Sequence, residues 1–268
     1  MAGSPRSPGR GAPRARVQRS AVAAGLVVAL LAAWYLTTGP LELVNSLQFP
    51  SPDDAYEALR QLTSPGYAGA TLARHIADSL ALVGLGFVAA TLTGIPLGIL
   101  MGSSRLAEAY INPVFQLIRP IAPIAWIPLT ILWFGLGTAA KVFVVWLAAF
   151  SPAAINAFTG VRNVDPVLIA AARVHGASAR QVLSQVVIPA SLPTIFTGLR
   201  VSLQACWMVL VAAELVGSFA GLGHIMIIAT RDLNSGMIFV AMACVALLGV
   251  ALSVALAWVE RWAVPWRR

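Results

Sequence analysis

Charged residues are scarce in this chain of 268 residues, of which only 10% are Asp, Glu, Lys or Arg. A soluble domain ordinarily carries about 25% charged residues. Hydrophobic residues make up 59% of the chain, and its mean hydropathy is +0.82. Because so few side chains can form a hydrated surface, these values exclude a soluble globular protein and predict an integral membrane protein surrounded by lipid.

Lysine and cysteine are also rare, and their rarity excludes several kinds of chemistry. A phosphate-binding loop needs Gly-x-x-x-x-Gly-Lys followed by Ser or Thr, whereas the only lysine, Lys141, follows two alanines and precedes Val142. The two cysteines, Cys206 and Cys244, lie in apolar runs without a Cys/His cluster, which excludes a metal site and a disulfide framework. We therefore expect no metal and no cofactor in this chain.

The formal net charge of +8 comes from arginines that flank the apolar runs. Nucleic-acid binding, which also uses basic residues, is not expected from this placement. Lys and Arg beside membrane spans are retained on the cytoplasmic side, so both termini are expected in the cytoplasm. The flanking residues are Arg6, Arg10, Arg14, Arg16 and Arg19 before the first apolar run, and Arg261, Arg267 and Arg268 after the last.

The apolar runs predict an all-α polytopic membrane protein with about six transmembrane helices. The first run could instead be a signal peptide, because arginines precede it; we favour a retained helix. Prolines break the third run, at positions 113, 120, 123 and 128. The predicted spans are 21–36, 72–101, 109–134, 139–159, 194–217 and 237–259.

Composition divides the chain into three parts. Residues 1–20 are rich in Pro, Gly, Ser and Arg, which predicts a disordered cytoplasmic tail. Residues 21–259 form the transmembrane domain, and residues 260–268 form a cytoplasmic C-terminal tail. The long outer loop, 38–70, should contain one short helix, with Ser51 as its cap, that ends near Leu62.

Three glycines in the second span repeat every four residues, at Gly94, Gly98 and Gly102. Residues four apart lie on one face of a helix, and glycine lets a second helix approach closely. The spacing therefore predicts a close helix–helix contact along this face.

The cytoplasmic loop 160–193 predicts a helix–turn–helix. Asp165 can cap a first short helix, Gly176 allows a turn, and Ser178 can cap a second helix. We expect prolines at 189 and 193 to end that second helix before the fifth span begins. Small residues on the first helix would let the groove of another protein approach closely.

This loop resembles the cytoplasmic signature of permeases of binding-protein-dependent ABC importers, which is Glu-Ala-Ala, three residues, Gly, nine residues, Ile-x-Leu-Pro. The sequence departs from it at the first position, where Ala170 replaces Glu, so a charge contact there is lost. The spacing matches at every position, and the residues at the signature positions are Ala170, Ala171 and Ala172, then Gly176, then Val186, Val187, Ile188 and Pro189. The resemblance implies that these residues, with Arg173, contact an ATP-binding subunit.

Other segments resemble the nitrate, aliphatic sulfonate, taurine and bicarbonate permeases, over about residues 45–265. Examples are Leu117–Ile121, Trp133-Phe134-Gly135 and Val211–Glu214. The resemblance implies a type I ABC importer permease fold in the bacterial inner membrane, in contact with lipid. It also implies a partner subunit that binds ATP and Mg²⁺, an external substrate-binding protein, and a second permease copy, identical or different. The implied solute is small and anionic.

Polar residues inside the spans are candidates for the solute path, because intramembrane charges usually face a cavity or a partner. Each also has a structural alternative: Glu214 could pair with Arg231, Lys141 or another buried donor, and the others could join helices. The candidates are Arg119, Asn156, Gln204, Glu214 and His224.

Other functions remain open at this point. A permease of the same architecture could carry a different small solute, such as a vitamin precursor. A secondary transporter often shows inverted repeats, and none is visible in the sequence. An intramembrane enzyme would need a set such as HExxH or paired aspartates, which the sequence lacks.

Overall fold

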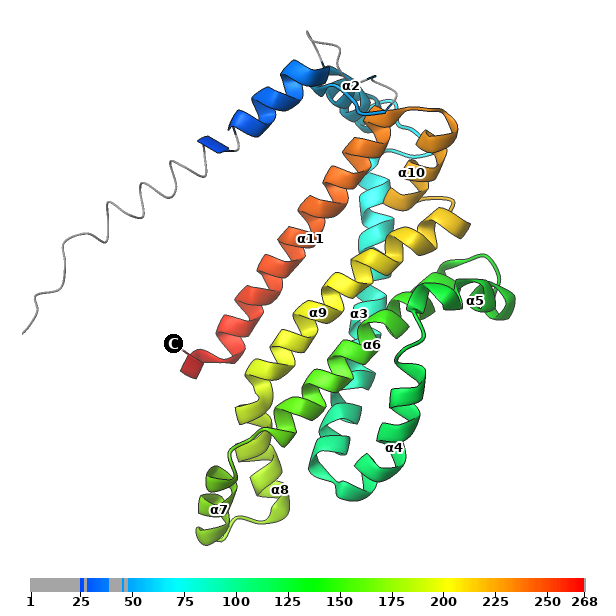
Figure 1. Cartoon of the computed structure of the whole chain (residues 1–268). Helices are drawn as coiled ribbons and strands as arrows, with labels where there is room; N and C mark the ends of the chain where they lie inside the picture. Colours follow the sequence, from blue (N-terminus) through cyan, green and yellow to red (C-terminus); the bar gives the residue numbers. More distant parts are fainter. Residues whose placement is uncertain (1–24, 27, 39–44, 46–47, 268) are drawn as a thin grey trace, which may run out of the picture.

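The computed structural model describes residues 25–26, 28–38, 45 and 48–267, and these residues form helices without any β-strand (Figure 1). The predicted tail at 1–20 lies outside the described residues. After an N-terminal helix, Val28–Thr38, the elements are α2 (Pro52–Thr63), α3 (Leu72–Ser103), α4 (Arg105–Ile118), η1 (Pro123–Trp126), α5 (Ile127–Phe134), α6 (Thr138–Arg162), α7 (Pro166–Val174), α8 (Ala179–Gln181), η2 (Val182–Val187), α9 (Ile188–Gly217), α10 (Leu222–Arg231), α11 (Ser235–Ala263) and η3 (Pro265–Arg267).

Within the described residues, four helical segments are long and apolar enough to cross a membrane: α3, α6, the continuous helix Ala179–Gly217, and α11. They confirm the predicted spans at 72–101, 139–159, 194–217 and 237–259. The helices run side by side in one bundle (Figure 1). We call its two ends the α7 end, which carries α7 and α8, and the α10 end, which carries α2 and α10.

The short helix α2 forms as its first residues predict. Ser51 Oγ accepts a hydrogen bond from the backbone N–H of Asp54, and Asp54 Oδ2 accepts one from the N–H of Ser51, which completes a capping box. Ala58 and Leu62 are buried against the main core. The helix therefore lies on the α10 end with one apolar face packed on the bundle.

The repeated glycines of α3 face α6, as predicted. A Cβ atom at Gly94 would lie 3.1 Å from the Cβ of Ala153, and one at Gly102 would lie 2.8 Å from the Cβ of Val161. No larger side chain fits at these positions unless the two helices separate. This contact makes α3 and α6 the central pair of the bundle.

The predicted third span is broken into two arms, because α4 and the η1–α5 segment meet at an angle of 81°. Ala122, which precedes a proline, has ψ of 129°, since a residue before proline is forced away from helical angles. The two arms contact the bundle near both of its ends. Glu108 in α4 forms an ion pair with Arg162 at the α7 end, whereas Leu136, just after α5, contacts Gly217 near the α10 end.

The N-terminal helix Val28–Thr38 reaches the α10 end beside α11. The Trp34 ring lies 4.9 Å from the Phe239 ring, centroid to centroid, and Trp34 Nε1 donates a hydrogen bond to the Pro50 carbonyl. The described part of this helix is too short to count as a span, and the start of the predicted span 21–36 lies outside the described residues. The structure therefore holds four or five crossings among its described residues, while the sequence predicts about six.

One prediction about the loop 160–193 is wrong, because Pro189 and Pro193 do not end a helix. Helical structure is continuous from Ala179 to Gly217. Pro189 is the second residue of α9, which begins directly after the π-helical segment η2. A proline ring normally clashes with the carbonyl four residues earlier. The Ile188 N–H donates to the Leu183 carbonyl, five residues earlier, so the helix is already widened into a π turn where Pro189 enters it.

Candidate functional site

The loop between α6 and α9 is a helical hairpin that extends beyond the bundle at the α7 end (Figure 1). Asp165 caps α7, since its Oδ1 accepts a hydrogen bond from Val167 N at 2.8 Å. Gly176 has φ of +82°, and the Gly176 and Ala177 N–H groups bond back to the Arg173 and Ala172 carbonyls. This is a Schellman ending, which needs a residue in the left-handed region. The predicted cap and turn are both present.

The inner face of the hairpin holds it against the end of the bundle. Ala172 and Ile169 pack on a cluster of buried valines that joins α6, α7 and η2. The valines are Val161, Val164, Val182 and Val187. The hairpin is therefore fixed to the bundle by its own small core.

The outer face of α7 is apolar and uncovered. Val167 is 70% exposed and Val174 is 85% exposed. Ala170, Ala171 and Arg173 are also exposed. An exposed apolar patch on a folded protein marks an interaction site. We call this patch, formed by Val167, Leu168, Ala170, Ala171 and Val174, the α7 patch.

The predicted coupling residues thus divide between three places. Ala170, Ala171 and Arg173 lie at the surface beside or within the α7 patch, whereas Ala172 faces the bundle and Gly176 forms the turn. Ile188 and Pro189 belong to the first turn of α9 and are half-buried. They support the hairpin rather than contribute to its outer surface.

A cavity of about 500 Å³ lies at the break between α4 and η1, beside α6 and α9. It brings together two predicted path residues, Arg119 and Asn156. Arg119 ends α4 and is exposed, and no ion pair involves it within the described part of the chain. Asn156 Nδ2 donates to the Pro152 carbonyl at 2.8 Å. Val201 and Met208 of α9 complete one wall.

The other three candidates lie outside this cavity. Gln204 is exposed on the face of α9 that also carries Val201 and Met208. Glu214 is fully buried near the α10 end, where it accepts hydrogen bonds from Ser79 Oγ and the Gly223 N–H. The partner of Glu214 is therefore another buried donor, and neither Arg231 nor Lys141 forms an ion pair with it within the described residues.

His224 lies in α10 with its ring 6.5 Å from the His75 ring, centroid to centroid. Burial lowers the pKa of His224, and the nearby His75 lowers it further. The imidazole of His224 therefore favours the neutral form at the α10 end of the bundle.

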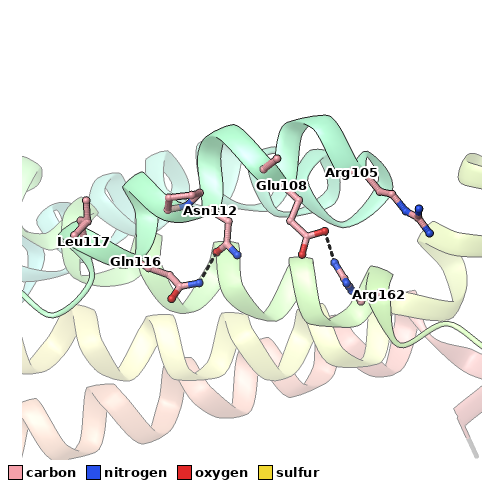
Figure 2. Close-up of a pocket in the computed structure, with 8 residues that line it drawn as sticks. Arg105, Glu108, Asn112, Gln116, Leu117 and Arg162 are labelled. Atoms are coloured by element: carbon pink, nitrogen blue, oxygen red, sulfur yellow. Dashed lines mark hydrogen bonds and ion pairs between the residues drawn. The ribbon is translucent and has the colours of Figure 1, made fainter.

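A second, larger cavity of about 930 Å³ runs along α4 toward the α7 end (Figure 2). Glu108 and Arg162 form an ion pair across it, and Gln116 Nε2 donates to Asn112 Oδ1 at 3.2 Å. Sequence reasoning missed this surface. The sequence does contain a signal for it, since polar residues recur every three or four positions here and so lie on one helix face. They are Arg105, Glu108, Asn112, Gln116 and Arg119.

Comparison with known proteins identifies the family to which this chain belongs. Residues 94–268 match the family described as binding-protein-dependent transport system inner membrane component. The chain belongs to this family. It is therefore the membrane-spanning permease subunit of an ABC importer, as its signature loop predicts.

The permease is similar to named relatives over most of its length. It is 39% identical over 243 residues to the taurine transport system permease protein TauC of Escherichia coli strain K12, covering 90% of this chain and 88% of that protein. It is 34% identical over 242 residues to a Bacillus subtilis strain 168 protein provisionally named aliphatic sulfonates transport permease SsuC, covering 90% and 86%.

A solved structure of the MetNI methionine ABC transporter in an inward-facing conformation has the same fold. The TM-score is 0.64, with 21% identity, over 72% of this chain and 95% of that chain. The all-α prediction of an ABC importer permease fold is thereby confirmed.

Proposed function

We propose that this permease imports a small organic sulfonate, of the class to which taurine belongs. The observation that carries the proposal is the Arg119 guanidinium at the 500 Å³ cavity, which forms no ion pair within the described residues. A planar guanidinium binds an oxyanion through two parallel hydrogen bonds. The names of the taurine and aliphatic sulfonates relatives support the same class of solute.

The polar face of α4 continues this path toward the α7 end. Gln116 is exposed on α4, one arm of the bent apolar helix pair, Arg119 is exposed at its end, and Asn112 is half-buried one turn before Gln116. Such groups are costly in lipid and are expected to face water or a partner. We therefore place a second copy of the permease across this face, so that the two α4 arms enclose the solute path. His224 and Glu214 are not part of that path in this proposal.

Two further partners follow from the family description and from the exposed α7 patch. An ATP-binding subunit docks on the α7 patch and hydrolyses ATP with Mg²⁺, since this chain has no phosphate-binding loop. An external binding protein delivers the solute at the α10 end. Arginine-rich segments favour the α7 end as the cytoplasmic one, with both termini in the cytoplasm of a bacterial inner membrane.

The geometry suggests how docking drives transport. The helix from Ala179 to Gly217 is a single piece of 39 residues, so a movement of the hairpin at the α7 end tilts the wall of the solute path. Alternation between inward-open and outward-open states is then a rigid-body movement of packed helices.

Transport assays in proteoliposomes test the proposal. The permease is reconstituted with its copurifying ATP-binding subunit and binding protein, and labelled taurine is offered with ATP inside the vesicles. ATP-dependent uptake that unlabelled alkyl sulfonates inhibit is the expected result. If unlabelled sulfonates do not inhibit uptake and the complex transports an uncharged solute instead, the proposed class of solute is contradicted.

A further inference from the structure

At the start of α10, the backbone N–H groups of the N-cap residue Gly221 and of the first two helical residues are all bound by side chains from other helices. Gly221 N donates to His75 Nδ1 at 3.0 Å, Leu222 N donates to Ser79 Oγ at 2.9 Å, and Gly223 N donates to Glu214 Oε2 at 2.8 Å. The start of a helix leaves such donors without partners inside the helix. Here α3 supplies two acceptors and α9 supplies the third. We call His75, Ser79 and Glu214 the clamp.

The clamp is fully buried. All three side chains have no exposed surface, and Ser79 Oγ also donates to Glu214 Oε1 at 2.8 Å. The Glu214 carboxylate lies at the N-terminus of α10, where the helix dipole favours negative charge. Every acceptor therefore has a named donor, as burial of such polar groups requires.

The orientation of His75 is fixed by the same bonds. Its Nδ1 accepts a hydrogen bond from Gly221, so the ring hydrogen is on Nε2, which donates to the Tyr67 carbonyl at 3.0 Å. Tyr67 in turn donates its hydroxyl to Asp232, which ends α10. Burial and this hydrogen bond raise the pKa of Tyr67, so the hydroxyl remains a donor. Both ends of α10 are thus attached, directly or through His75, to the segment that runs from Tyr67 to Ser79.

Two glycines make the approach possible. A Cβ atom at Gly221 would lie 2.2 Å from Glu214 Oε1, and one at Gly223 would lie 2.7 Å from the Cβ of Glu214. Gly221 also has φ of +122°, a conformation that favours glycine. Nearby, Lys141 Nζ of α6 donates a hydrogen bond to Ser218 Oγ at 2.7 Å. This bond attaches the α9–α10 connection to α6 as well.

Glu214 stands near the far end of the continuous helix that begins at Ala179. That helix has 39 residues and spans about 58 Å at ~1.5 Å per residue. Its first turns belong to the hairpin of the α7 end, and its last turn bears the clamp. One helix therefore connects the α7 patch to α10 across the whole bundle.

We propose that the His75–Ser79–Glu214 clamp makes the outer segment 218–234 move with α3 and α9 as one body, so that docking of the binding protein is transmitted to the hairpin. The proposal rests on the proposed function, because it assumes an external binding protein and an ATP-binding subunit. It makes Ser79 a positioning residue for coupling. It also explains why a buried carboxylate occurs outside the solute path.

The test compares two buried serines. Ser79→Ala removes the acceptor for Leu222, whereas Ser202→Ala is the matched control, since Ser202 is equally buried but bonds the Ala149 carbonyl of α6 instead. The first measurement is amide hydrogen exchange of residues 218–223 in the assembled complex. We expect exchange about tenfold faster with Ser79→Ala, as for loss of one buried hydrogen bond, and unchanged exchange with Ser202→Ala.

The second measurement is ATP hydrolysis by the complex, with and without the solute-loaded binding protein. We expect Ser79→Ala to keep basal hydrolysis and complex yield but to lose most of the stimulation. Unchanged exchange, or faster exchange with full stimulation, overturns the proposal. A parent complex without any stimulation contradicts the proposed function instead, while the exchange result still tests the clamp.

A second pair of variants keeps the proposal testable if Ser79→Ala assembles poorly. Glu214→Gln keeps an acceptor for Gly223 and a polar group for Ser79, whereas Glu214→Met has a similar length without hydrogen-bonding oxygens. Stimulation should survive in Glu214→Gln and be lost in Glu214→Met. Equal stimulation in the two variants overturns the clamp as a coupling element.

Discussion

A Cβ atom on Gly98 would lie 2.2 Å from the carbonyl oxygen of Ala154, so the backbones of α3 and α6 are in direct contact there. The backbone atoms near Gly98 are held in place by the hydrogen bonds of their own helix. None of the nearest atoms belongs to a flexible side chain that could move aside. This contact sets the distance between the two central helices and hence the shape of the cavity that α6 helps to line.

Substitution at Gly98 should therefore destabilise the permease. Gly98→Val forces α3 and α6 apart, and overpacking of this kind costs about 1–3 kcal/mol. We expect a lower unfolding temperature in detergent and a lower yield from membranes. Gly84→Val is the control, because a Cβ at Gly84 meets no atom within 4 Å. Equal stability of the two variants would show that the helices can separate freely.

Substitution in the α7 patch should affect assembly with the ATP-binding subunit rather than folding. Ala171 is exposed, so Ala171→Trp fits the isolated permease but blocks close approach of a partner. We expect normal membrane insertion, loss of ATPase copurification and loss of transport. Ala73→Trp, at an exposed site near the α10 end, should leave copurification intact. Normal ATPase recovery with Ala171→Trp would contradict the docking assignment.

Gly176→Val tests the same surface by a different route. A Cβ at Gly176 meets no neighbour, so the effect comes only from the φ of +82°. Left-handed backbone costs about 1–2 kcal/mol for a residue with a side chain. We expect a reoriented hairpin with reduced ATPase recovery and an unchanged transmembrane bundle, measured by copurification and by protease sensitivity of the loop.

The purified permease alone should hydrolyse no ATP, because the only lysine is not part of a phosphate-binding loop. Hydrolysis should require the copurifying subunit and magnesium. A phosphate-release assay on the separated subunits checks this. Magnesium-dependent turnover by the isolated permease would falsify the division of roles.

Arg119 should matter through its charge. Hydrogen bonds to a charged group contribute about 1.5–3 kcal/mol, so Arg119→Gln should reduce sulfonate uptake about tenfold or more. Arg119→Lys keeps the charge but loses the planar fork, so partial uptake is expected. Complex yield should stay at the parent level in both variants, since Arg119 forms no ion pair among the described residues.

The outcomes separate three roles of Arg119 when uptake is compared with yield. Low yield in both variants indicates a structural role. Parent-like uptake with Arg119→Gln would mean that selection for the anion occurs on the binding protein. Arg231→Gln, at the α10 end and outside both cavities, serves as a charge-removal control.

Features that depend on nearby residues could be predicted from the sequence. The capping box of α2, the turn at Gly176 and the break in the third span each follow from one or two residues and their immediate neighbours. The glycine face of α3 was also predictable, since its spacing alone identifies it. Each of these features depends on residues that are close together in the chain, so packing against distant helices is not needed to predict it.

Features that join distant parts of the chain could not be predicted. Ser79 and Glu214 are 135 residues apart, and nothing in the sequence pairs a serine with a buried carboxylate. The sequence left Arg231, Lys141 or another buried donor open as the partner of Glu214, and a hydroxyl and a backbone N–H fill that role. The π-helical segment was missed for another reason: proline is normally read as a helix end, and its accommodation depends on the preceding turn.

The six residues of the π-helical segment, Val182–Val187, have a consequence for angular register. An α-helix rotates by about 100° per residue, and a π turn contains roughly one residue more than an α turn. Because each kind of turn completes one full rotation, the π segment absorbs the extra residue without turning the hairpin about the axis of α9, whereas the same residue added to a regular α-helix would swing the hairpin by about that angle. The wider turn thus preserves the azimuth of the α7 patch, and hence the side from which a partner can reach it.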